Sequence, residues 1–353
     1  MKEISINNTR NIEMDLLKGV AILLVVFGHV ISSESILFRY INTFHMPLFF
    51  FISGFFAYRS FNKYDISKII YDKLRRLAVP FLCVSVLAVI MNILMDAVSK
   101  VKVNWLDYIF SSFIYAKSAW FLIVLFLTFF FHAVAMFLKK KNCLWLIVPL
   151  TILIYLFAPD HFLMLGKFKT MLPFFEIGYF INSGEKSRNI IFNKNYVITA
   201  MGVLYLILPA IYFNYKDFIN YSYFNYILSN ASYEIFQYLY YTSISACGIA
   251  FAFSAVTYIV KAMRLSCIMS DIGKYSLDIY IIHPFIIKII SLFSVLGLYK
   301  CGILPLAIQL ACSVIITIMC WQLAKKILYK ISLYRLLFAP ENKKKKCDME
   351  AKK

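Results

Sequence analysis

Apolar residues in this chain form long runs that are separated by short polar segments. A helix needs roughly 20 mostly apolar residues to cross a membrane, and most of the runs approach that length. The pattern predicts an all-α, polytopic membrane protein with about ten transmembrane helices. The predicted spans are 14–33, 43–60, 77–98, 118–138, 143–159, 170–182, 196–214, 236–260, 275–297 and 303–324. The sixth is short and contains Glu176, so we expect it to be tilted, broken or re-entrant.

The composition supports this interpretation. Hydrophobic residues make up 61% of the chain and charged residues only 16%, and the mean hydropathy is +0.74. Soluble domains have about 45–50% apolar and about 25% charged residues. The surplus apolar surface therefore faces lipid. We expect one transmembrane domain over residues 1–335, followed by a basic and disordered cytoplasmic tail, 336–353, that lies near anionic lipid.

Basic residues predict the orientation of the chain. With both termini in the cytoplasm, 27 Lys and Arg residues fall on the cytoplasmic side and eight fall outside. Cytoplasmic segments of membrane proteins carry this excess of positive charge, so N-in and C-in is the predicted orientation. The net charge of +19 then indicates contact with lipid headgroups and no nucleic-acid partner. Eight scattered cysteines without a C-x-x-C pair predict neither a disulfide framework nor a zinc site.

Polar residues in the first span are the strongest functional signal. Lys18 and His29 are eleven residues apart, so their side chains share one helix face and are separated by a rise of about 16 Å. Lys18 would lie near the cytoplasmic surface and His29 deep in the outer half. Asp15 lies one turn before Lys18 and can pair with it. Ionisable groups within spans are usually functional, although a snorkelling lysine and a structurally bonded histidine are the simpler alternative.

Histidines in two other spans could act together with His29. His45 enters the second span from the outside and could lie at the depth of His29, where the two could orient each other, share proton transfer or bind a metal. His283 in the ninth span could supply a third ligand, but the spacing does not require one, and we predict no metal. It follows Tyr280 by one turn and could also only stabilise helix packing. Pro47, Ser53 and Gly54 predict a second helix that bends and packs closely.

The loop after the second span holds the densest basic cluster. It could simply set the orientation of the chain, or it could bind phosphates on the side where Lys18 lies. An outer segment, 215–235, is rich in aromatic residues and is either an interfacial belt or a platform for sugar rings. The basic residues of the loop are Arg59, Lys63, Lys68, Lys73, Arg75 and Arg76.

Together these segments resemble the acyltransferase family 3 membrane proteins. Lys18 and His29 match a basic residue eleven positions before a histidine in the family's first helix, with Lys in place of the usual Arg. Lys73-Leu-Arg-Arg76 stands where the family has a cytoplasmic Arg-x-x-Arg. The segment Phe44–Gly54 resembles the fucose 4-O-acetylase-like branch, and Trp120–Phe126 and Ile272–His283 resemble two further family segments.

The resemblance implies an O-acyltransferase of the bacterial cytoplasmic membrane. Acyl-CoA, most simply acetyl-CoA, would be a co-substrate, with no bound cofactor, and the acceptor would be a hydroxyl of a cell-surface or lipid-linked carbohydrate. His29 would act as general base or carry the acyl group, with His45 orienting it. Donor phosphates would bind Lys18, Lys73, Arg75 and Arg76. The supporting residues would be Asp15, Glu176, Trp120, Tyr280 and His283.

The main alternative is a proton-coupled transporter or an exporter of a lipid-linked sugar, since intramembrane His, Asp and Glu also suit a proton relay. Transporters often contain two related halves with broken helices in matching positions. The helix with a basic residue and a histidine occurs once in this chain, which favours the enzyme. A purely structural membrane protein is the remaining alternative.

Overall fold

The computed structural model describes residues 12–31, 35–99, 104–184, 196–212, 227–256, 266–292 and 305–338. Within these ranges the chain is helical, with short turns between helices and no strand. The elements are α1 (Ile12–Val30), α2 (Ile36–Lys63), α3 (Ile66–Lys73), the π-helix η1 (Leu74–Ala78), α4 (Val79–Ser99), α5 (Trp105–Ile109), η2 (Phe110–Ile114), α6 (Trp120–Lys140), η3 (Leu144–Leu146), α7 (Ile147–Phe157), η4 (Phe162–Met164), α8 (Leu165–Ser183), α10 (Tyr196–Tyr212), α12 (Ile227–Ala255), α13 (Ser266–Lys274), α14 (Ser276–Leu292), α16 (Leu306–Lys326), η6 (Leu328–Lys330) and α17 (Ser332–Phe338).

The all-α membrane fold predicted from the apolar runs is confirmed. Each predicted span coincides with a helix over most of its described length. In the described part of the chain, four helices meet both the length and the apolarity needed to cross a membrane: 36–63, 66–98, 120–140 and 306–330. The remaining spans fall on helices that are shorter or carry more polar residues.

Two expectations about particular segments need correction. The sixth span is neither broken nor re-entrant, because α8 is a continuous 19-residue helix. Residues 227–235, which were expected in an outer loop, belong to α12. The aromatic residues predicted to form the belt, from Tyr215 to Tyr226, lie outside the described residues. So does most of the predicted tail, since α17 ends at Phe338.

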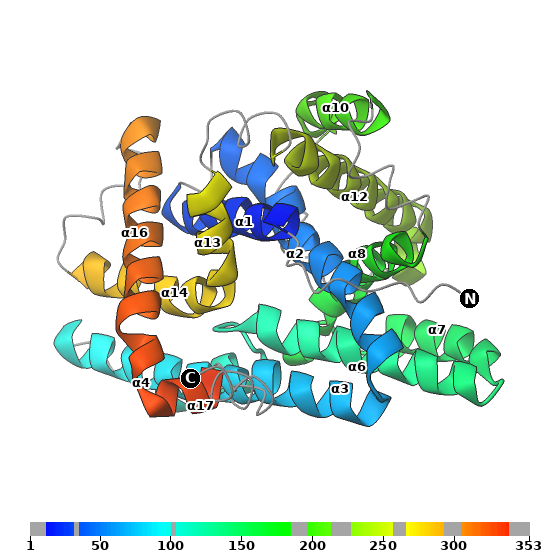
Figure 1. Cartoon of the computed structure of the whole chain (residues 1–353), viewed down its shortest axis with the longest axis horizontal. Helices are drawn as coiled ribbons and strands as arrows, with labels where there is room; N and C mark the ends of the chain where they lie inside the picture. The colour runs from blue at the N-terminus through cyan, green and yellow to red at the C-terminus, as the bar shows by residue number, and fades with distance from the viewer. Residues whose placement is uncertain are drawn as a thin grey trace, which may run out of the picture.

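Helices α1 and α2 occupy the middle of the bundle, with α16 along one edge and α10 at another (Figure 1). Glycines bring α13 against α1. A Cβ atom at Gly19 would lie 2.1 Å from the carbonyl oxygen of Met269, and one at Gly273 would lie 1.8 Å from that of Asp15. Only a residue without a side chain permits this approach of two backbones. The cytoplasmic half of α1 is thereby fixed.

The close packing predicted for the second helix is confirmed at Gly54. A Cβ atom there would lie 1.9 Å from the carbonyl oxygen of Phe175 in α8. The contact is reciprocal, because a Cβ at Gly178 of α8 would lie 2.0 Å from the carbonyl oxygen of Phe51 in α2. This pair of glycines holds α2 and α8 together.

Prolines in both of these helices free a carbonyl that another helix binds. Proline has no N–H, so Pro47 leaves the carbonyl of Thr43 without its helical donor. The hydroxyl of Ser245 in α12 donates to that oxygen at 2.6 Å. Pro173 likewise leaves the carbonyl of Lys169 without its helical donor, and the hydroxyl of Tyr155 in α7 donates to it at 2.6 Å. Such replacement is needed wherever water cannot reach the freed group.

Candidate functional site

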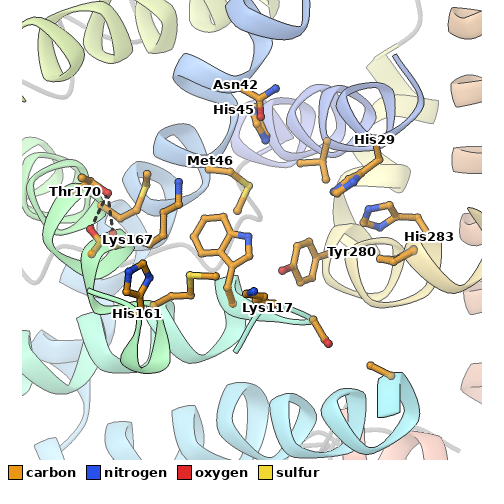
Figure 2. Close-up of a pocket in the computed structure, with 18 of the residues that line it drawn as sticks. His29, Asn42, His45, Met46, Lys117, His161, Lys167, Thr170, Tyr280 and His283 are labelled. Atoms are coloured by element: carbon orange, nitrogen blue, oxygen red, sulfur yellow. Dashed lines mark hydrogen bonds between the residues drawn. The ribbon is translucent and has the colours of Figure 1, made fainter. Parts of the chain in front are cut away.

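A cavity of about 760 Å³ opens among the helix ends that we predict to face outward. Its walls come from the end of α1, the first turns of α2, the residues before α6, the turn before α8 and the middle of α14 (Figure 2). Residues far apart in sequence meet there because the helices alternate in direction. The functional side chains that line it include His29, Asn42, His45, Lys117, Trp120, Asp160, His161, Lys167, Tyr280, His283 and Lys288.

His29 and His283 face each other on one wall of the cavity. Their ring centroids are 5.0 Å apart and the planes are tilted by 51°. His29 is exposed at the end of α1, whereas His283 in α14 is fully buried. Tyr280, one turn before His283, has its ring centroid 6.0 Å from it. Its hydroxyl accepts the backbone N–H of Phe121, at the start of α6, at 3.4 Å.

Backbone contacts determine which nitrogen is basic in the two buried histidines. Nδ1 of His45 lies 2.6 Å from the carbonyl oxygen of Ile41, and Nδ1 of His283 lies 2.9 Å from that of Ile279. A carbonyl only accepts, so each Nδ1 carries the hydrogen and each Nε2 is left as an acceptor. Nε2 of His283 is buried and has no hydrogen-bond partner in the described structure. It is therefore an unused hydrogen-bond acceptor beside the cavity.

Four imidazoles line the cavity, those of His29, His45, His161 and His283, and such groups suit proton transfer to or from a hydroxyl group. In the ranges that the structure describes, no three His, Cys, Asp or Glu side chains are grouped as metal ligands. From the sequence we expected His45 to be the functional partner of His29. In the structure, the ring that packs against His29 is that of His283. His45 lines the same cavity and is 7% exposed.

Lysines surround the other parts of the cavity. The ammonium group of Lys167 lies 5.8 Å from the centroid of the Trp120 ring, and that of Lys117 lies 5.7 Å from the Tyr115 ring. Lys288 donates to the amide oxygen of Asn92 in α4. The predicted supporting residue Trp120 is thus part of the cavity wall, beside a cation.

The predicted donor-binding residues lie elsewhere, and none of them lines the cavity. The predicted pair of Lys18 and Asp15 is present, with 3.6 Å between Nζ and Oδ1. Lys73 stands 3.8 Å from the centroid of the Phe129 ring and within electrostatic reach of both Lys18 and Arg76. Three of the four expected cations are therefore near Lys73: Lys73 itself at the end of α3, Lys18 on α1 and Arg76 in η1.

Arg75 and Arg76 lie in the π-helix η1, directly before Pro80 at the start of α4. A π-helical turn inserts an extra residue and often occurs at functional sites. Arg76 is exposed, whereas Arg75 is half-buried and its guanidinium lies 5.8 Å from the Tyr71 ring. The turn therefore presents the two arginines to different surroundings.

His132 is a buried polar residue that the sequence analysis missed. Its Nδ1 lies 2.9 Å and 3.1 Å from the two carboxylate oxygens of Glu176. The ring of Tyr179 covers the imidazole, with centroids 4.2 Å apart. The predicted supporting residue Glu176 thus belongs to a pair between α6 and α8, not to the cavity. A histidine within a span is itself the signal that could have found this pair.

Asp278 anchors the C-terminal helices and does not enter the cavity. It accepts the hydroxyl of Tyr334 at 2.6 Å and that of Tyr329 at 3.2 Å. The carboxylate is 5% exposed. These two bonds tie the residues after α16 to the cytoplasmic end of α14, so α17 packs beside η1 and α4.

Comparison with known proteins shows the family to which the chain belongs. The sequence model of the acyltransferase 3 family, described as an acyltransferase domain, matches residues 11–325. A nodulation protein, NolL, from Sinorhizobium fredii (strain NBRC 101917 / NGR234) is 34% identical over 85 residues, which cover 21% of this chain and 23% of that protein. The matched region thus spans about a quarter of this curated relative. No solved structure matches the chain. Because the family match covers nearly the whole chain, this multi-pass membrane protein belongs to the acyltransferase 3 family.

Proposed function

We propose that the chain transfers an acyl group, most simply acetyl, from cytoplasmic acyl-CoA to a hydroxyl of a cell-surface or lipid-linked carbohydrate. The observation that carries the proposal is the placement of Lys18 and His29 on α1. One lies in a cationic group at one end of the helix, and the other lies on the cavity wall about 16 Å further along. Acyl-CoA has charged phosphates in one part and a thioester at its end, so it would fit along a helix with a cationic group at one level and a histidine at another.

The cationic group would hold the donor phosphates. Lys73 lies within electrostatic reach of both Lys18 and Arg76, and phosphates are bound well by clustered Lys and Arg side chains. Arg75 is next to Arg76 in the same π-helical turn. Asp15, which is 5% exposed at its side chain, fixes Lys18 from one side. The thioester end of the donor would then point along α1 toward His29.

His29 would act on the acceptor hydroxyl. In direct transfer, its imidazole takes the hydroxyl proton while the oxygen attacks the thioester carbon, and CoA leaves as a thiolate that is then protonated. General base catalysis of this kind contributes about 10²–10⁴-fold. In the alternative, His29 attacks the thioester carbon and CoA leaves as a thiolate. The acceptor hydroxyl then loses its proton as its oxygen takes the acyl group from the histidine and frees the imidazole. The buried Nε2 of His283 and the imidazole of His45 stand nearby to accept or relay the proton.

The likeness of Phe44–Gly54 to the fucose 4-O-acetylase-like branch supports an acetyl donor and a sugar acceptor. It also supports placement in the bacterial cytoplasmic membrane, with membrane lipids around the bundle. The family match favours an acyltransferase over the transporter alternative, because it extends over residues 11–325.

The test uses purified protein and labelled acetyl-CoA, with extracted cell glycolipids and polysaccharide as acceptor. We expect His29→Ala to lose at least about 100-fold of the transfer rate, and Lys18→Ala to raise the KM for acetyl-CoA. Lys140→Gln, on the exposed end of α6, is the matched control and should behave as wild type. Full activity of His29→Ala would refute the mechanism.

A further inference from the structure

We propose that the acceptor carries an anionic group, a phosphate or a carboxylate, which Lys117 and Lys167 bind in the outer cavity, where Lys288 adds a third positive charge. This proposal rests on the proposed function and specifies its acceptor. All three lysines line the cavity. They come from three separate parts of the chain: the turn before α6, the start of α8 and the middle of α14.

The position of these lysines runs against the general charge distribution of the chain. Only eight Lys and Arg residues fall in the predicted outer segments, and outer loops of membrane proteins are generally poor in them. Two of those eight, Lys117 and Lys167, line this cavity, together with Lys288 from within a span. A lysine within a span is costly and usually faces a functional cavity.

The cavity does not neutralise this positive charge by itself. Among the residues that the structure describes, the one carboxylate that lines it belongs to Asp160, and that group is bound at 2.8 Å by the ammonium of the fully buried Lys169. In the described part of the chain, Lys117 and Lys167 form no ion pair and contact only aromatic rings through their ammonium groups. An anionic ligand would supply the missing negative charge.

The arrangement also orients the acceptor. His29 and His283 stand on one side of the cavity, Lys167 stands across from them, and Lys117 lies between (Figure 2). An acceptor whose charged group binds Lys167 and Lys117 would extend its neutral part toward His29. The hydroxyl to be acylated would then be separated from the anion by the width of a sugar ring or more.

The donor is the other possible source of an anion, since acyl-CoA carries phosphates. We assign the anion to the acceptor because the cytoplasmic group of Lys18, Lys73 and Arg76 already offers the donor a phosphate site outside this cavity. Kinetic constants separate the two assignments. Lysines that bind the acceptor affect the KM for the acceptor, and lysines that bind the donor affect the KM for acetyl-CoA.

The experiment takes glycolipids and polysaccharide from host cells that lack this protein and separates them on an anion-exchange resin at neutral pH. The purified full-length protein is then given labelled acetyl-CoA and each fraction. We expect label in the retained, anionic fraction only. Label in the unretained, neutral fraction would overturn the proposal. Transfer into neither fraction would count against the proposed function itself.

Variants test the residues directly. Lys167→Gln and Lys117→Gln should each raise the KM for the retained fraction about tenfold or more and leave the KM for acetyl-CoA unchanged. Lys167→Arg keeps the charge and should restore most of the affinity. A rise in the KM for acetyl-CoA alone, or wild-type constants in both Gln variants, would overturn the assignment. Mild acid release of the sugar from its lipid then shows whether the anion is a carrier phosphate or a group on the sugar.

Discussion

The imidazole rings of His29 and His283 lie 5.0 Å apart across one wall of the outer cavity. The first helix presents one of them to the cavity, and α14 holds the other in a fully buried position. Since Nδ1 of His283 donates to the carbonyl of Ile279, its Nε2 is the nitrogen that can accept a proton. In the proposed mechanism, this pairing places an acceptor nitrogen beside His29.

Amide side chains can separate the two nitrogens of His283. His283→Asn keeps a donor near the Nδ1 position but lacks Nε2, so we expect kcat to fall by about 10²-fold while the KM for acetyl-CoA stays unchanged. His283→Gln places an amide group near the Nε2 position and should retain more activity. Steady-state kinetics on the purified variants measure both effects. An equal loss in the two variants, together with a lower melting temperature, would indicate a packing role instead.

The cytoplasmic cluster predicts a different kinetic effect. Lys73→Gln removes a charge that lies beside Lys18 and Arg76, so we expect the KM for acetyl-CoA to rise about tenfold with little change in kcat. Lys73→Arg should bind the donor at least as well, because a guanidinium binds phosphate in a bidentate manner. Lys140→Gln is the control for charge alone. An unchanged KM in Lys73→Gln would remove Lys73 from the donor site.

The sequence was sufficient to predict relationships along one helix. The shared face of Lys18 and His29 follows from helical periodicity alone, and the pair of Asp15 and Lys18 is confirmed at 3.6 Å. The close packing at Gly54 was also predicted. Partners on other helices were not, because hydropathy does not specify which helices touch. The contact of His29 with His283 depends on how α1 and α14 pack.

Polar residues explain why the sixth span was predicted to be shorter than α8, the helix found there. Lys167, Lys169 and Glu176 interrupt its apolar run, so the sequence suggested a short or broken segment. In the structure each of them has a specific environment: Lys167 faces the cavity, Lys169 pairs with Asp160, and Glu176 pairs with His132. The helix is continuous because these contacts compensate for its polarity.

The pair of His132 and Glu176 predicts a non-additive effect on stability. Glu176→Leu leaves a buried imidazole donor without its acceptor, which costs about 1–3 kcal/mol. Adding His132→Leu removes the stranded group, so the double variant should be more stable than the sum of the two single changes predicts. Thermal unfolding in detergent, in a four-variant cycle, measures this coupling. Additive losses would show that the two side chains act independently.

Two helical glycines make a matched pair for testing the contact of α2 with α8. A methyl group at Gly54 would meet the carbonyl oxygen of Phe175 at 1.9 Å, whereas one at Gly28 would find its nearest atoms at 3.9 Å. We therefore expect Gly54→Ala to lower stability by at least about 1–3 kcal/mol and Gly28→Ala to leave it nearly unchanged. Melting temperatures of the two purified variants and the wild type measure this difference in stability. Equal melting temperatures would contradict the close contact.

The effect of removing the Ser245 hydroxyl on stability should depend on whether residue 47 is proline. Ser245→Ala removes the hydroxyl that binds the Thr43 carbonyl, and such bonds between membrane helices contribute about 0.6 to 1.7 kcal/mol. In a Pro47→Ala background, residue 47 regains an N–H that can bind the same carbonyl within the helix. The loss caused by Ser245→Ala should then be smaller. Ser243→Ala, whose exposed hydroxyl bonds only within α12, is the control. An equal loss in both backgrounds would show that the hydroxyl stabilises the protein without replacing the donor that Pro47 lacks.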